Sequence, residues 1–229
     1  MNEEFRARTD PPGGTVPLFA TPFAALNTGA DRHFNERLAS LCESQRSALP
    51  LPRDPSHDPL RFQGREDLLA SADTTAVELK RFILNQAAAV IAGLNNGTAE
   101  FSRLHIQAQG WCSIVQRNGH VPAQHFSNAS WLVMYCVQAG VSDAGFNNAG
   151  VLRLYERRPG SMYRDASTSE LRSPYRYGNH TWSPLPGWMA LFPAHVPHEV
   201  SVVRSDTALI LVFAKIRFLE AEATDSGNG

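Results

Sequence analysis

Two histidines of the sequence, His125 and His198, stand beside apolar runs in a way that could bring their side chains together. His125 ends the segment RNGHVPAQH just before the run SWLVMYCV, and His198 ends the segment PGWMALFPAHVPH, in which a Pro-Gly turn leads into a second apolar run. Both runs have the length and composition of buried strands. Neutral imidazoles suit iron, zinc and copper, so the two histidines predict a metal site if their strands meet.

Further polar residues could complete such a site. His120 lies five residues before the first histidine of the pair, and His195 lies three residues before the second. Each is a candidate third ligand or a neighbour of the ligands. Asp143 and Glu156 are carboxylate candidates, in a loop and at a strand end. A site of two histidines and water, or a barrel that no longer binds metal, is also open.

The strands that must position these histidines begin at residue 101. From there the sequence consists of short runs rich in Val, Ile, Leu, Tyr and Trp, separated by Gly, Pro and Asn. This spacing predicts a sandwich, a jelly roll or a barrel. Earlier in the chain, helical periodicity predicts an amphipathic helix over 31–46 and a longer helix over 72–94.

The resulting fold class is α+β, with helices packed on a C-terminal all-β core. We expect one domain over residues 15–220, divided into a helical portion over 15–100 and a jelly-roll core over 101–218. The polar ends, 1–14 and 221–229, are expected to be flexible. A homodimer formed through the helix over 72–94 is possible.

Composition excludes several classes of protein. The 21 Lys and Arg residues nearly balance the 22 Asp and Glu residues, and no long basic run occurs, so nothing predicts binding to nucleic acid or to membranes. The polar N-terminus lacks a signal-peptide core, which favours a cytoplasmic location. The three cysteines have no CxxC spacing and are expected to be buried free thiols. Nucleophile-elbow, phosphate-loop and HExxH motifs are absent.

Four segments resemble the 2-oxoglutarate/Fe(II) oxygenases, a family with a cupin-like double-stranded β-helix, which is a jelly roll. They are VPLFATPFAAL, GWCSIVQRNGHVPAQH, GVLRLYERRPG and PGWMALFPAHVPHEV. The last is the most specific, because it is similar to the family's Gly-(apolar)-Phe-Pro approach to the distal iron histidine. The resemblance implies that His198 is this ligand and that His125, rather than His120, is the proximal one.

The resemblance also implies a reaction. Fe(II) held on one face by two histidines and a carboxylate keeps adjacent positions open for a 2-oxo acid and then O2. The family resemblance therefore implies an oxidoreductase that uses Fe(II) and 2-oxoglutarate on a small organic substrate. Hydroxylation is the default outcome, and desaturation, cyclisation, rearrangement or halogenation are alternatives.

Two positions depart from the family pattern. Ser127 stands two residues after the first histidine, where Asp or Glu is usual, and alignment of TALILVF places Ala208 where an Arg commonly binds 2-oxoglutarate. The residues expected to line the cosubstrate or substrate pocket, the arginines as possible substitutes, are Trp111, Tyr135, Arg153, Arg158 and Arg204. The departures keep two alternatives open: a three-histidine dioxygenase that needs no 2-oxoglutarate, and a catalytically silent cupin-like binding module.

Overall fold

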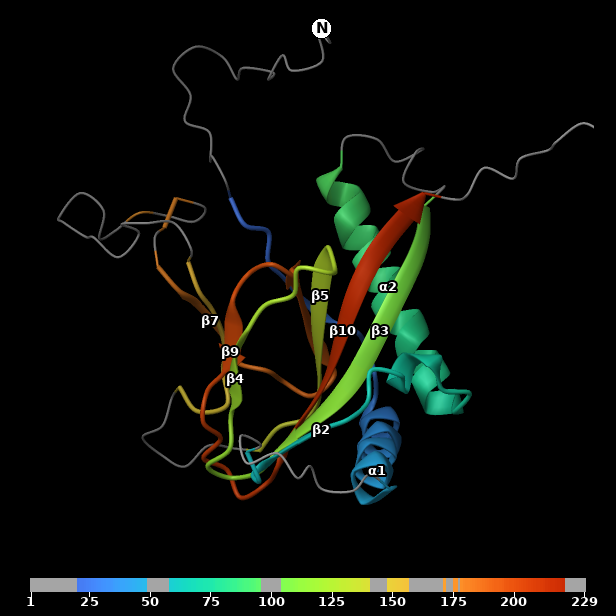
Figure 1. Ribbon diagram of the computed structural model, residues 1–229, viewed down its shortest axis with the longest axis vertical. Helices are drawn as coiled ribbons and strands as arrows, with labels where there is room; N and C mark the ends of the chain where they lie inside the picture. The colour runs from blue at the N-terminus through green and yellow to red at the C-terminus, as the bar shows by residue number, and fades with distance from the viewer. Residues whose placement is uncertain are drawn as a thin grey trace, which may run out of the picture.

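The computed structural model describes residues 20–48, 58–95, 104–140, 148–156, 171, 175–176 and 178–220. Within these residues, two α-helices pack on two antiparallel sheets (Figure 1). The elements, in chain order, are β1 (Ala24–Asn27), α1 (Arg32–Ala48), β2 (Arg61–Gln63), the 3-10 turn η1 (Leu68–Ala70), α2 (Thr74–Leu94), β3 (Leu104–Val115), β4 (Val121–Gln124), β5 (Trp131–Gln138), β6 (Leu152–Leu154), β7 (His180–Trp182), β8 (Trp188–Pro193), β9 (His198–Val200) and β10 (Leu209–Glu220).

The two sheets form the jelly roll that the sequence predicts. The larger sheet has the strand order β1-β8-β5-β10-β3-β2, and the smaller has the order β4-β9-β6-β7. All named strand pairs are antiparallel. The N-terminal portion contributes two short strands to this architecture, β1 and β2, which occupy the two edges of the larger sheet. The α+β prediction with helices before a β core is confirmed.

The larger sheet separates two hydrophobic cores, and strand β5 shows how. Its sequence WLVMYCVQ is apolar almost throughout because both of its faces are buried. Side chains alternate across a strand, so Val133 and Tyr135 lie in the core under the helices, whereas Leu132 and Met134 lie in the core between the sheets. One strand therefore contributes to both cores.

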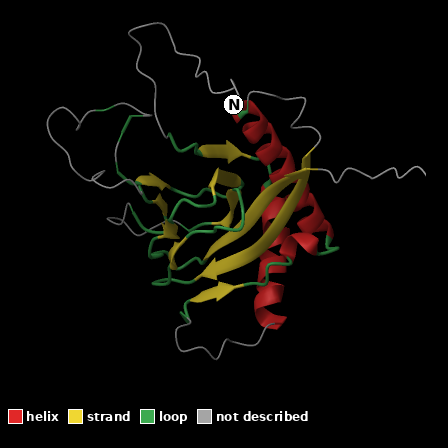
Figure 2. Ribbon diagram, turned by 45° about the horizontal axis from the view of Figure 1, so that its top comes forward, coloured by secondary structure: helices red, strands yellow, loops and turns green. Residues whose placement is uncertain are grey.

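Both helices cover the outer face of the larger sheet (Figure 2). Helix α2 begins after Asp73, whose carboxylate accepts hydrogen bonds from the backbone N–H groups of Thr75 and Ala76. Its buried side chains recur every three or four residues, which keeps one stripe against the sheet. The members of this stripe are Thr75, Ala76, Leu79, Ile83, Ala87 and Ile91.

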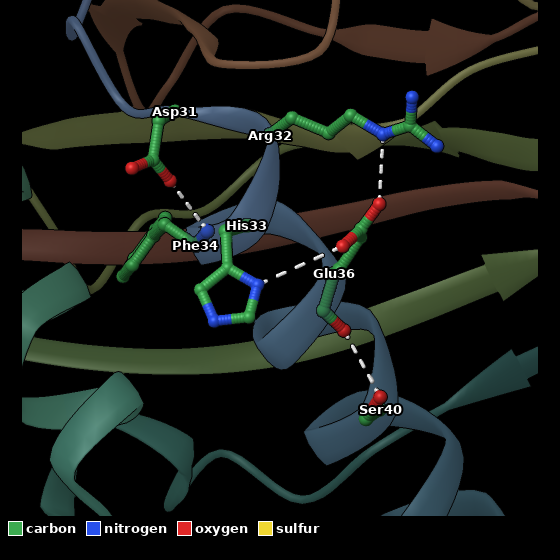
Figure 3. A network of polar contacts seen from close by, with 6 residues as sticks. All are labelled: Asp31, Arg32, His33, Phe34, Glu36 and Ser40. Carbon is green, nitrogen blue, oxygen red and sulfur yellow. Dashed lines mark hydrogen bonds and ion pairs between the residues drawn. The ribbon is translucent and has the colours of Figure 1, made fainter.

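Polar contacts at the start of α1 keep its first turn in place (Figure 3). The Asp31 carboxylate accepts a hydrogen bond of 2.7 Å from the backbone N–H of Phe34, whose ring is buried in the core. On the exposed side, Arg32 and Glu36 form an ion pair of 2.8 Å. His33 is also exposed here, with Nδ1 at 3.8 Å from the Glu36 carboxylate. This end of α1 is thus a capped helix start.

Three further expectations concern the outside and the thiols. Cys42, Cys112 and Cys136 are buried free cysteines, as predicted. No helix in the described part of the chain is long and apolar enough to span a membrane. Val77 and Leu94 are exposed on α2, and the homodimer through this helix stays a prediction.

Candidate metal centre

Strand pairing in the smaller sheet brings the two predicted ligands together. In the ladder of β4 and β9, Gln124 stands opposite His198, and His125 follows Gln124 directly. The two histidines are close enough for electrostatic interaction, since His125 is among the groups that lower the pKa of His198. His125 is exposed and His198 is completely buried. Two residues 73 positions apart in the sequence thus share one end of the jelly roll.

The imidazole of His198 has one bonded and one unbonded nitrogen. Its Nδ1 lies 2.9 Å from the backbone oxygen of Val196. A carbonyl oxygen only accepts, so Nδ1 carries the proton and Nε2 carries a lone pair. This Nε2 is buried and has no hydrogen-bond partner among the described residues. Burial lowers the pKa of His198, with the nearby His125 acting in the same direction, so the ring stays neutral.

An unpartnered buried lone pair costs stability unless something binds it. A backbone carbonyl on the far ring nitrogen is also the usual way in which proteins orient a metal-binding histidine. The donor set therefore fits a metal ion: His198 Nε2 is a preorganised ligand, and His125 is the exposed second ligand beside it.

Aromatic rings surround the buried histidine. The ring centroid of His198 lies 5.2 Å from that of Phe192, 6.0 Å from that of Phe126 and 6.5 Å from that of Phe213. Trp111 packs against two of these rings, at 5.5 Å from Phe126 and 5.6 Å from Phe213. This collar keeps water away from the inner side of the candidate site.

The end of the jelly roll that carries His198 is defined by three connections between strands. The backbone N–H of Phe126 donates to the oxygen of Ala194, after β8. The N–H of Ser130 donates to the oxygen of Ile216, in the second half of β10. The loop after β4, the turn after β8 and the region of β10 near Ile216 therefore lie together.

Lys215 lies at this same end, and the sequence analysis missed it. It belongs to the face of β10 that carries Phe213, because side chains two positions apart point the same way. Its exposure is only 7%, and its Nζ lies 2.6 Å from the Glu66 carboxylate. The same Nζ lies 5.6 Å from the centroid of the Trp111 ring and 5.5 Å from that of Phe126.

Ala208 is a poor counterpart of the cosubstrate-binding arginine, which corrects the alignment made from sequence. It precedes β10 and packs with the core under the helices. The following residue, Leu209, stands opposite Val115, at the end of β10 remote from Ile216. The cation on the side of His198 is instead Lys215. The signal was a single charge in LILVFAKI, at alternate spacing with inward-facing residues.

Two other candidates lie at the opposite end of the jelly roll. His120 precedes Val121, which pairs with Val200, so it stands at the far end of β4 from His125. It is exposed, with Nδ1 at 3.7 Å from the Asp58 carboxylate. Arg204 donates a hydrogen bond of 2.6 Å to the Asn118 side chain, in the turn after β3. The structure therefore brings neither residue to His198, and the three-histidine alternative loses His120.

Strand direction also removes two expected pocket residues. Arg153 forms an ion pair of 3.1 Å with Glu199 on the outer face of the smaller sheet, because its neighbours on β6 point inward. Tyr135 points to the helices, where its hydroxyl donates a 2.7 Å hydrogen bond to Asn35 on α1. These placements correct the expectation that Arg153 and Tyr135 line a pocket with His198. Of the described residues expected to line it, only Trp111 faces that core.

The remaining candidates do not assemble a third ligand. His195 is exposed in the turn between β8 and β9, and Ser127 is exposed in the loop between β4 and β5. Glu156 follows β6, with its backbone N–H bonded to the Asn179 side chain. Within the described ranges, no three His, Cys, Asp or Glu side chains group closely enough to hold a metal ion. Arg158 and Asp143 lie outside the described residues.

Comparison with solved structures shows what this chain is similar to. A Pseudomonas putida prolyl-4-hydroxylase superposes with a TM-score of 0.54 at 12% identity, covering 85% of this chain and 91% of that one. A 2OG-Fe(II) oxygenase family oxidoreductase from Burkholderia pseudomallei gives 0.50 at 12% identity, covering 85% and 84%. The non-heme alpha ketoglutarate dependent carbocyclase SnoK from nogalamycin biosynthesis gives 0.60 at 7% identity, covering 91% and 85%.

These likenesses extend over most of both chains, and at such low identity they show a shared fold. Searches by sequence found no matching family model and no matching curated protein.

Proposed function

We propose that this protein is a non-haem Fe(II) oxygenase that uses 2-oxoglutarate and O2 to oxidise a small organic substrate, with His125 and His198 as iron ligands. The observation that carries the proposal is the His198 imidazole, whose Nε2 is buried, unprotonated and without a partner among the described residues. The fold shared with prolyl-4-hydroxylase and SnoK supports the class of reaction.

Iron and 2-oxoglutarate would supply the oxidation chemistry, and the chain would supply geometry and environment. The Val196 carbonyl orients the His198 ring, and the Phe192 and Phe213 rings exclude water from its inner side. His125 approaches from the exposed side, where ligands can enter.

Lys215 is the residue that we assign to the distal carboxylate of 2-oxoglutarate. A buried ammonium group in an aromatic setting binds a carboxylate more strongly than an exposed one, because the local dielectric is low. Its position on the face of Phe213, whose ring contacts His198, places it in the same core as the ligand. The substitute for the missing arginine is thus a lysine on β10.

The third protein ligand has no candidate in the described part of the chain. Ser127 is exposed and is a weak ligand for Fe(II) in its neutral form. We therefore propose a two-histidine site in which solvent and cosubstrate take the other positions. Such a site leaves an additional position open, which favours outcomes other than simple hydroxylation, such as cyclisation, desaturation or rearrangement.

The experiment that tests the proposal is anaerobic absorption spectroscopy of the purified protein, with Fe(II) added first and 2-oxoglutarate second. We expect a visible metal-to-ligand charge-transfer band that needs both additions. His198→Ala and His125→Ala should each abolish it. His33→Ala is the matched control, because His33 is an exposed histidine on α1 that takes no part in the site.

The other outcomes are equally informative. Iron retained without a band would contradict the use of 2-oxoglutarate and leave a metal enzyme that works without it. No iron retained by the unaltered protein would contradict the enzyme proposal and favour a cupin-like binding module.

A further inference from the structure

The ion pair between Lys215 and Glu66 joins a buried group to an exposed one. The lysine side chain is 7% exposed, whereas the Glu66 side chain is 46% exposed, and the two charged atoms lie 2.6 Å apart. Lys215 is confined further by the Trp111 and Phe126 rings beneath its ammonium group. Of the two partners, only the glutamate has solvent beside it into which it can turn.

The backbone on both sides of Glu66 is anchored to β3. The N–H of Gly64 donates to the oxygen of Cys112 at 2.8 Å, and Asp67 forms a β-bridge with Gly110. Leu69 then packs so closely on Gly110 that a Cβ there would lie 2.7 Å from its side chain. With its backbone held on both sides, Glu66 can leave Lys215 by rotation of its side chain alone.

An incoming carboxylate and the Glu66 carboxylate compete for one cation. Lys215 Nζ is a compact charge with three donors, and a second anion at the same nitrogen would meet the repulsion of the first. Burial of an unpaired ammonium group is costly, so some anion must hold Lys215 while no ligand is bound. The position of Glu66 provides this anion from within the chain.

We propose that Glu66 is a built-in substitute for the ligand carboxylate: it neutralises Lys215 in the empty site and rotates into solvent when a carboxylate ligand binds. This inference rests on the proposed function for the identity of the natural ligand, the distal carboxylate of 2-oxoglutarate. Its consequence is that Glu66 weakens cosubstrate binding, since every binding event must first break an ion pair. Glu66 is thus a positioning residue that sets the cosubstrate concentration at which the site fills.

The test is the binding of glutarate to the metal-free protein by isothermal titration calorimetry. Glutarate has the two carboxylates of 2-oxoglutarate but lacks the keto group, so it reports on the lysine without requiring iron. We expect Glu66→Gln to bind glutarate roughly tenfold more tightly than the unaltered protein, because the neutral amide no longer competes. Glu66→Asp, which keeps the charge on a shorter side chain, should fall between them.

Glu78→Gln is the matched control, because Glu78 forms an ion pair of 3.1 Å with Arg37 between the two helices, on the other side of the sheet. Its glutarate affinity should equal that of the unaltered protein. Equal, weaker or undetectable glutarate binding by folded Glu66→Gln would overturn the inference, and far-UV circular dichroism establishes that the variant is folded.

The two proposals fail separately. If Glu66→Gln gains affinity for glutarate but no charge-transfer band forms with Fe(II) and 2-oxoglutarate, the role of Glu66 stands and the oxygenase proposal fails. If the band forms in the unaltered protein and Glu66→Gln gains nothing, the oxygenase proposal stands and Glu66 is only a structural partner of Lys215.

Discussion

The two faces of the larger sheet are built from the same strands but serve different purposes. The face under α1 and α2 is aliphatic, and the polar contact given above for it, from Tyr135 to Asn35, is satisfied within the protein. The face toward the smaller sheet carries aromatic rings together with the unpartnered Nε2 of His198 and the ammonium group of Lys215. Alternation along each strand thus separates stability from chemistry, and mutations on the two faces should have separable effects.

The largest effect on stability is expected on the helix-covered face. Ile83 is completely buried on α2, and Ile83→Ala should lower the free energy of unfolding by about 2–5 kcal/mol, because it removes apolar contacts and leaves a cavity. Urea denaturation followed by circular dichroism measures the loss. Val77→Ala on the exposed side of the same helix should change it by less than about 0.5 kcal/mol.

The metal affinity of Ile83→Ala should equal that of the unaltered protein. A loss of metal affinity in a folded Ile83→Ala variant would show that the two faces are coupled, contrary to the comparison.

The next effect is expected at His198, on the other face. A metal bound to the folded state alone should stabilise the unaltered protein by about 2.7 kcal/mol when free metal is roughly 100 times Kd. His198→Leu should remove this gain completely, whereas Ile83→Ala should retain it. Thermal unfolding with and without Mn(II), an oxygen-stable substitute for Fe(II), measures the difference. A Mn(II)-dependent shift that survives in His198→Leu would exclude His198 as a ligand.

How much of this could be read from the sequence differs between the two faces. The helix-covered core was predictable, because its signal is local: α2 repeats apolar residues at helical spacing after the Asp73 cap. His125 and His198 were predictable because each stands at the edge of a recognisable strand segment. Arg153 was assigned wrongly although its neighbours, Leu152 and Leu154, indicate that it points outward.

Two other assignments required information that is not local. Tyr135 belongs to a strand that is apolar on both faces, so its composition does not tell which face meets the helices. Lys215 required the register of β10 against β5, in which Ile216 stands opposite Trp131, at the end where His198 lies. Register arises from pairing between distant segments, and alignment of a short motif selected Ala208 instead.

A smaller effect is expected from Lys215, which concerns the cosubstrate rather than the metal. Lys215→Met keeps the apolar part of the side chain and removes the charge, so 2-oxoglutarate should bind about tenfold to a hundredfold more weakly while metal affinity is unchanged. Titration of the charge-transfer band with 2-oxoglutarate measures this. Arg217→Met is the control, because Arg217 is the next residue on the same face of β10 and is exposed. An equal loss in both variants would indicate general attraction of the anion rather than a specific subsite.

The smallest effect is expected from the buried polar pair under the helices. Tyr135→Phe should cost about 1 kcal/mol of stability at neutral pH, because it leaves the Asn35 side chain without its donor. A double-mutant cycle with Asn35→Ala isolates the contribution of the pair, and metal and cosubstrate affinities should not change.

The cost of Tyr135→Phe should also depend on pH in one direction. Burial raises the pKa of Tyr135 from 10.0 to about 12 in the folded protein. Above pH 10 the unfolded chain loses this phenolic proton while the folded protein retains it, so the stability that the tyrosine provides falls as pH rises toward 12. The difference between the unaltered protein and Tyr135→Phe should therefore shrink over that interval, as measured by urea denaturation at each pH. A constant difference would show that the hydroxyl is not shielded by the helices, and the separation of the two faces would lose its simplest evidence.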